Sequence, residues 1–319
     1  MSDGAPEHPV PSDRARELVR GGYDTHIHIS PDVVNRRITD VRLARRFAEL
    51  GLAGFGLKSH YTSTAERARV VSAAVPDVDT IGTITLNRAV GGMNPVAVEI
   101  AAREGARIVW FPTVSSENEQ HEVLAADPNG KVPVWVRFEL ELREAGVVPE
   151  PVPVVRDGAL VDEARAVLEA IARHDLVLAT GHLSRDEILV LVDAAVDAGV
   201  RRIVVTHPEF PSQRIGVEDQ LALAERGALL ERAFTTPYTG KCSWEQIFES
   251  SRAVGPERTV WSTDLGQVFN PPVEDGLAIM ADRFLEAGFE DEEVRTMAVD
   301  NTRFIAEANS SARERVAAA

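Results

Sequence analysis

The stretch LVLATGHLSRDEILVLVDAAVDAG, residues 176–199, decides the fold, because a short apolar strand pattern (176–183) passes directly into a helical one (184–199). The same strand-then-helix order recurs from Gly22 onward. The predicted strands are 22–28, 53–60, 80–86, 107–113, 176–183, 201–208, 228–234 and 258–266. Eight such units in about 250–300 residues predict an α/β fold, a (β/α)8 TIM barrel. An open doubly wound sheet is the alternative, but no Gly-rich dinucleotide fingerprint follows the first strand.

The regular alternation stops after the fourth predicted strand, where residues 114–160 form an insertion. Within it, 131–142 and 151–161 read as strands, the second with an Asp-Gly turn, and together they predict an inserted hairpin or cap. The role of the insertion stays open. Residues 1–20 are polar and Pro-rich and predict a flexible tail, which leaves 21–319 as a single barrel domain.

Composition narrows the possible partners. The chain has 319 residues and a net charge of −16, from 50 acidic and 34 basic residues, so we expect neither nucleic acid nor a membrane as partner. A single cysteine, Cys242, excludes an intrachain disulfide and a thiolate-rich metal site. No apolar run reaches the ~20 residues of a membrane span, and the N-terminus lacks an apolar signal core. These features predict a cytoplasmic protein that acts on a small molecule; a homo-oligomer is possible on this sequence.

The histidines are concentrated at the ends of predicted strands. Five of the eight histidines end strands one, two, five and six, and an aspartate has the same position on strand eight; they are His26, His28, His60, His182, His207 and Asp264. In a barrel the carboxyl ends of the strands meet on one face, where active sites are built. Because side chains alternate along a strand, His26 and His28 point the same way, as do Lys58 and His60.

Imidazole and carboxylate ligands suit a divalent transition metal, with zinc the first choice and manganese or iron as alternatives. A metal lowers the pKa of bound water towards ~7, and Asp264 beside that water could act as general base. His207 or His60 could stabilise the oxyanion, although a strand-end histidine such as His60 is often only a hydrogen-bonded core residue. Further candidates for binding substrate, in particular an anionic one, are Lys58, His60, Arg36, Asn87 and Arg88.

This set resembles the amidohydrolase superfamily: an Asp-x-His-x-His first strand, histidines ending strands five and six, an aspartate on strand eight, and the late segment NTRFIAEA. The resemblance implies a barrel with one or two metal ions. His26 and His28 would then bind the first metal with Asp264. His182 and His207 would bind a second, or His182 would join the first while His207 steadies the attacking water.

The sequence departs from that superfamily at strand four, which ends in Trp-Phe-Pro-Thr without the carboxylated lysine or glutamate that bridges two metals. The absence favours a single metal. Lys58, on strand two, is either a displaced, carboxylated metal ligand or an unmodified lysine that binds a substrate anion or pairs with an acid.

The predicted function is a metal-dependent hydrolase in which a metal-bound hydroxide attacks an amide, cyclic amide, lactone or ester carbonyl. The main alternative is a multinuclear phosphoesterase, because GFGLKSHYTST (54–64) resembles the second-strand segment of the polymerase and histidinol phosphatase family. Against it, Lys58 and Ser59 replace that family's Thr and Asp, and Asp264 is not followed by x-His. Decarboxylation, C–C hydrolysis and a barrel that binds metal or ligand without turnover are further alternatives.

Overall fold

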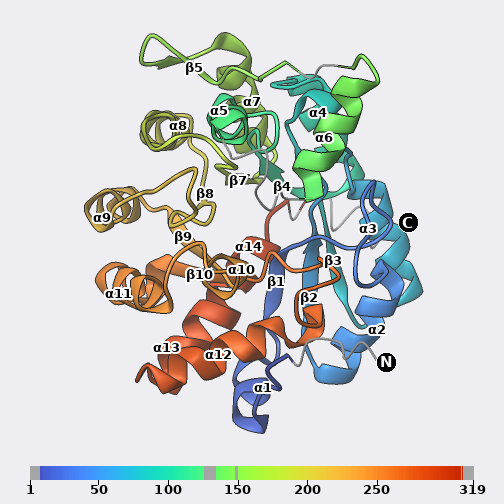
Figure 1. Cartoon of the computed structure of the whole chain (residues 1–319), viewed down its shortest axis with the longest axis vertical. Helices are drawn as coiled ribbons and strands as arrows, with labels where there is room; N and C mark the ends of the chain where they lie inside the picture. Colours follow the sequence, from blue (N-terminus) through green and yellow to red (C-terminus); the bar gives the residue numbers. More distant parts are fainter. Residues whose placement is uncertain (1–7, 126–133, 148–149, 310, 312–319) are drawn as a thin grey trace.

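The structure is a computed structural model that describes residues 8–125, 134–147, 150–309 and 311. Its core is a sheet of eight parallel strands with helices around the outside (Figure 1). In spatial order the strands are β1 (Tyr23–Ile27), β2 (Gly54–Leu57), β3 (Asp79–Thr85), β4 (Ala106–Trp110), β7 (Val177–Ala179), β8 (Arg202–Val205), β9 (Leu229–Ala233) and β10 (Thr259–Ser262). Spatial order follows chain order, as a (β/α)8 barrel requires. The predicted TIM barrel is therefore confirmed.

The outer layer is made by helices that follow the strands. These are α2 (Asp40–Leu50), α3 (Ala65–Ala74), α4 (Pro95–Glu104), α7 (Asp162–Arg173), α8 (Arg185–Asp197), α9 (Val217–Glu225), α11 (Trp244–Val254) and α12 (Gly276–Glu286). The stretch that predicts the fold gives β7 and α8, whose first turn is fixed by a capping box between Ser184 and Glu187. Short helical segments lie in the loops of the barrel: α10 (Thr235–Tyr238), Arg88–Val90, Pro256–Arg258 and Val273–Asp275.

The barrel closes between β10 and β1, through the residues that follow β10. The amide of Asp264 donates to the carbonyl of His26, and the amide of His28 donates to the carbonyl of Leu265, each at 2.8 Å. The buried carboxylate of Asp24 accepts hydrogen bonds from the backbone and hydroxyl of Thr263. We call this junction the barrel seam. It places the end of β1 directly beside Asp264.

Alternating side chains divide the strands between two environments. Ile108, Trp110, Val177 and Ala179 belong to the cluster that fills the barrel interior, whereas Val109 and others between them pack towards the helices. Two residues of the helix α14 (Asn301–Ala306), Ile305 and Ala306, belong to the same interior cluster. Arg107 and Arg202, at the amino ends of β4 and β8, bind the carbonyls of Ala306 and Phe304 in this helix. These contacts place α14 at the amino-terminal end of the barrel.

The insertion differs from its prediction. Residues 131–142 are predicted as a strand, but the structure has the helix α6 (Val134–Glu144) there, preceded by a second helix, α5 (Glu117–Ala125). Residues 126–133 lie outside the described residues. The residues of α6 are mostly good helix formers, and the side chains of Gln120 and Glu139 join α5 to α6 at 2.7 Å. The hairpin is real but smaller, with β5 (Val155–Arg156) and β6 (Ala159–Leu160) joined by the Asp-Gly turn.

The two ends of the described chain differ from the prediction. The first has a helix that was not predicted, and the last has a predicted helix that is divided into three segments. The prediction of a flexible tail is wrong for Asp13–Val19, which form the helix α1, capped by Ser12. Ser12 also binds Asp282 of α12, so the helix is held against the barrel. At the other end the predicted helix is divided into α13 (Asp291–Arg295), a π-helical segment (Thr296–Asp300) and α14. None of the helices in the described part of the chain has the length and hydropathy of a membrane-spanning segment.

Candidate metal centre and active site

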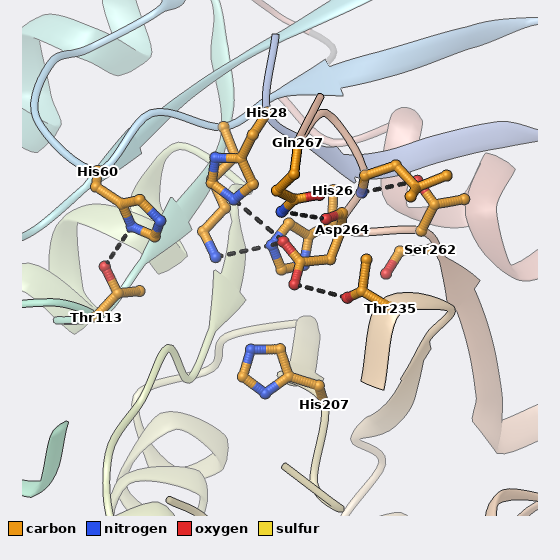
Figure 2. Close-up of polar contacts among 12 residues, drawn as sticks. His26, His28, His60, Thr113, His207, Thr235, Ser262, Asp264 and Gln267 are labelled. Carbon is orange, nitrogen blue, oxygen red and sulfur yellow. Dashed lines mark hydrogen bonds and ion pairs between the residues drawn. The ribbon is translucent and has the colours of Figure 1, made fainter. Parts of the chain in front are cut away.

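Three predicted ligands converge at the barrel seam. The Oδ1 atom of Asp264 lies 3.3 Å from Nε2 of His26 and 3.2 Å from Nε2 of His28 (Figure 2). Among the described residues, these three form the group whose ligand atoms all lie within 4.8 Å of one another. Two imidazoles and a carboxylate are a common zinc ligand set that leaves coordination positions open for water and substrate. The chemistry of the donor set therefore fits a single divalent metal.

Behind His26 lies a carboxylate that the sequence analysis did not identify as part of the site, Glu231 of β9. Its Oε1 accepts from Nδ1 of His26 at 2.9 Å and from the hydroxyl of Ser262 at 2.7 Å. Its Oε2 accepts the backbone N–H of His207 at 3.0 Å. A carboxylate behind a histidine places the proton on Nδ1 and leaves the Nε2 lone pair for a metal. Glu231 thus orients His26 towards Asp264.

Lys58 is close to the same lone pair. Its Nζ lies 2.8 Å from Nε2 of His26 and 5.1 Å from the ring centre of Trp110, which forms part of the barrel interior. Lys58 is buried, and burial lowers its pKa to about 8. The amine of Lys58 and a metal ion bound by His26 would use the same nitrogen, so Lys58 competes with the metal.

Burial and neighbouring charges determine the charge state of the site. Burial lowers the pKa of His28 to about 3 and that of His60 and His207 well below the usual value, so these rings stay neutral. Burial alone would raise the pKa of Asp264, but His26 and His28 outweigh it and lower the value. Burial and Lys58 lower the pKa of His26, but Glu231 and Asp264 outweigh them, so the pKa of His26 is raised above its usual value. The site therefore combines three neutral rings, those of His28, His60 and His207, with the ionised carboxylate of Asp264.

All five predicted strand-end histidines come together. Their rings follow one another in a closed circle, with centres 5.5 Å apart for His26–His28, 4.7 Å for His28–His60, 6.2 Å for His60–His182, 5.0 Å for His182–His207 and 6.0 Å for His207–His26. Nδ1 of His28, His182 and His207 is buried without a hydrogen-bond partner. His60 is held by Thr113 at 2.8 Å. The described structure gathers the predicted histidines, while their individual roles stay predictions.

Backbone strain is concentrated at two of these residues. His207 has φ +24° and Asp264 has φ +53°, values that non-glycine residues seldom adopt. Each conformation is fixed by a contact already described: the N–H of His207 binds Glu231, and the N–H of Asp264 binds the carbonyl of His26. Strained positions of this kind are characteristic of functional sites. The barrel thus holds both side chains in orientations that a relaxed backbone would not give.

Gly266 lets the chain after Asp264 pass against β1. Its φ is +137°, and a Cβ there would lie 1.5 Å from the carbonyl oxygen of His28. We expect Gly266→Ala to lower the free energy of unfolding by about 3 kcal/mol or more, because the clash and the backbone conformation both oppose a side chain. Urea unfolding measures this. Gly146→Ala is the control, since Gly146 also has a positive φ (+81°) but open space around it. Equal losses in the two variants would contradict the role given to the contact with His28.

Three predicted substrate-binding residues have different positions. The side chain of Arg36 is 7% exposed, and its Nε donates to Asp32 at 2.7 Å. Asn87 is also buried, but its amide holds the carbonyl of His60 and the hydroxyl and amide of Thr113, so its hydrogen bonds go to the protein. Arg88 binds backbone carbonyls of the insertion, at Glu150 and Pro151. All three side chains thus have partners within the protein, and their roles towards a substrate stay predictions.

Several polar residues of the site were not predicted from the sequence. They are Glu231, Ser262, Thr113, Thr235, whose hydroxyl donates to Asp264 at 3.0 Å, and Glu119 of the insertion. For Glu231 a signal existed, because a carboxylate in the middle of the apolar strand 228–234 must be buried and needs a partner. For Glu119 the sequence holds no comparable signal.

Solved structures with this fold include several hydrolases. An amidohydrolase from Pseudomonas aeruginosa matches 92% of this chain and 98% of its own at 13% identity, with a TM-score of 0.61. A metallopeptidase, a dipeptidase of family M19, matches 91% and 99% at 12% identity, with a TM-score of 0.55. An organophosphorus hydrolase from Deinococcus radiodurans matches 96% and 100% at 14% identity, with a TM-score of 0.55. A comparison with curated proteins gave no match.

These similarities confirm the barrel fold that the resemblance to the amidohydrolase superfamily implies, and the histidines and aspartate occupy the end of the barrel where such enzymes carry out catalysis. Residues 21–231 match the model of a family described as being of unknown function, DUF6282. The chain belongs to that family.

Proposed function

We propose that the protein is a metal-dependent hydrolase with a single metal held by His26, His28 and Asp264. The observation that carries the proposal is the convergence of Nε2 of both histidines on Oδ1 of Asp264. When bound, zinc or a similar ion would lower the pKa of a water molecule and polarise a carbonyl group. A multinuclear phosphoesterase is less well supported, because the described residues offer a single group of three close ligands.

The residues around the three ligands have separate tasks in this proposal. Asp264 stays ionised and accepts the proton of the attacking water, with Thr235 holding its second oxygen. His207 and His60 are neutral and can donate a hydrogen bond to the oxygen on which charge develops. Lys58 and Arg36 add positive charge beside them, which favours a substrate with an anionic group. The proposed substrate is a small amide, cyclic amide, lactone or ester that carries a carboxylate or phosphate, hydrolysed by a cytoplasmic enzyme.

Metal analysis combined with a substrate panel tests the proposal. We expect the purified protein to bind a single equivalent of zinc and His26→Ala to bind none. A chelator should abolish hydrolysis of a lactone or amide in the panel, and added zinc should restore it. If wild type and His26→Ala take up the same amount of metal, the proposed site is wrong. Two or three metals with turnover of p-nitrophenyl phosphate would indicate the phosphoesterase instead.

A further inference from the structure

The first turn of α5 is built around His182. The hydroxyl of Ser116 and the amide of Asn118 both donate to the backbone carbonyl of His182, at 3.0 and 3.2 Å. The same amide donates to the carbonyl of Ser212 at 2.7 Å. Ser116 also caps the turn by accepting the N–H of Glu119 at 3.0 Å. The insertion is therefore attached to the loop after β7 through the backbone carbonyl of His182.

The ring of His182 meets the same turn. Oε2 of Glu119 lies 3.4 Å from Nδ1 of His182, and both atoms are buried without a hydrogen-bond partner among the described residues. Glu119 itself is 5% exposed and His182 6%. Burial raises the pKa of Glu119, but the neighbouring His182 outweighs it, so the pKa is lowered and the carboxylate stays ionised. Ser212 also interacts with the carboxylate and helps to lower its pKa, but Oε2 has no other donor among the described residues, so that oxygen needs the proton of the His182 ring.

The pair repeats the arrangement at His26. There Glu231 accepts from Nδ1, and Nε2 faces Asp264. In both pairs a carboxylate lies behind Nδ1. A neutral imidazole has one N–H, so a carboxylate at Nδ1 fixes the tautomer and leaves Nε2 with a free lone pair on the opposite edge of the ring. One carboxylate comes from a barrel strand and the other from the insertion.

We propose that Glu119 is the positioning residue of His182: it holds the proton on Nδ1 and presents Nε2 to the histidine circle. The helix α5 is then part of the active site and not only a cover over it. The inference rests on the proposed function in that His182 acts in the hydrolytic reaction, as a metal ligand or as a partner of the substrate. In either role the lone pair of Nε2 is what Glu119 secures.

Nitrogen NMR of the full-length protein, labelled with ¹⁵N-histidine, tests the tautomer directly. Two-bond ¹H–¹⁵N correlations distinguish Nδ1–H from Nε2–H rings, and His182→Gln identifies the signals of His182. We expect Nδ1–H in the wild type, and a smaller Nδ1–H population in Glu119→Ala and Glu119→Gln, because neither variant offers a charged acceptor. Glu117→Ala is the matched control, since Glu117 lies on the same helix but pairs with Arg156. His26 should remain Nδ1–H in every variant.

An Nε2–H ring at His182 in the wild type, or an unchanged population in the Glu119 variants, would overturn the inference. If Glu119→Ala does not fold, Glu119→Gln decides alone by the same criterion. The NMR measurement needs neither metal nor substrate, so it can succeed when the hydrolase proposal fails, and the reverse. Where a substrate is found, Glu119→Ala should lower kcat about tenfold to a hundredfold with little change in KM, and Glu119→Gln should restore part of it. The same loss in Glu117→Ala would contradict the assignment.

Discussion

Replacing Asp264 with asparagine is expected to reduce kcat by about a thousandfold or more, even with saturating metal. The amide keeps the size of the side chain and can still contact Thr235, but it cannot accept a proton from water, and general base catalysis contributes about 10²–10⁴-fold. We also expect weaker metal binding, because a charged oxygen close to His26 and His28 is lost. Steady-state kinetics at several zinc concentrations separates the two effects.

The matched control for this variant is Asp186→Asn, which makes the same change at a carboxylate with an 86% exposed side chain at the start of α8. It should retain the activity of the wild type. If excess zinc fully restores the kcat of Asp264→Asn, then Asp264 is only a ligand, and the proton acceptor must be sought elsewhere in the site.

Lys58→Met is expected to bind zinc at least tenfold more tightly than the wild type. The ammonium group lies 2.8 Å from the nitrogen of His26 that would bind the metal, and it places a positive charge beside a divalent cation in a buried site. Like charges about 4 Å apart repel each other by several kcal/mol even at an effective dielectric constant of about 20, and a tenfold change in Kd needs only about 1.4 kcal/mol. Competition with a chromophoric chelator measures the affinity.

The same variant distinguishes the possible roles of Lys58. If Lys58 were carboxylated and bound the metal, its removal would weaken zinc binding. If it binds the anionic part of the substrate, KM for an anionic substrate should rise about a hundredfold while a neutral analogue is little affected. Arg201→Met is the control, because it also replaces a cation with methionine, at a side chain that is 71% exposed and lies 3.7 Å from Asp175. We expect a small effect on zinc affinity from that change.

The barrel could be predicted from the sequence because one pattern recurs eight times, and a single misread unit does not change the result. The convergence of the proposed metal ligands could be predicted from the fold alone, since strand ends meet wherever a barrel closes. The exact position of His182 could not be predicted in this way. It lies three residues beyond the end of β7, and its approach to His207 depends on the loop that Ser116 and Asn118 hold.

The insertion was harder to predict because its hydrophobic pattern is ambiguous. Val134, Val136, Phe138, Leu140 and Leu142 alternate as in a strand. In the helix, Val136 and Glu139 face inward while Leu140 is 47% exposed, so the pattern does not follow the burial. What decides the structure is packing against α5, a contact between two segments of the insertion. No local periodicity encodes that contact, and for the same reason Glu119 could not be recognised as a site residue.

The barrel seam has a consequence for assembly of the protein. His26 and His28 belong to the first strand and Asp264 follows the last, so the donors come together only when the sheet has closed on itself. A nascent chain with seven strands could hold two imidazoles but not the carboxylate between them. Tight metal binding should therefore appear only when the barrel has closed. A bound ion should in turn stabilise the contact between the first and last strands of the sheet. Loss of the metal should then destabilise the barrel first at the seam between β1 and β10.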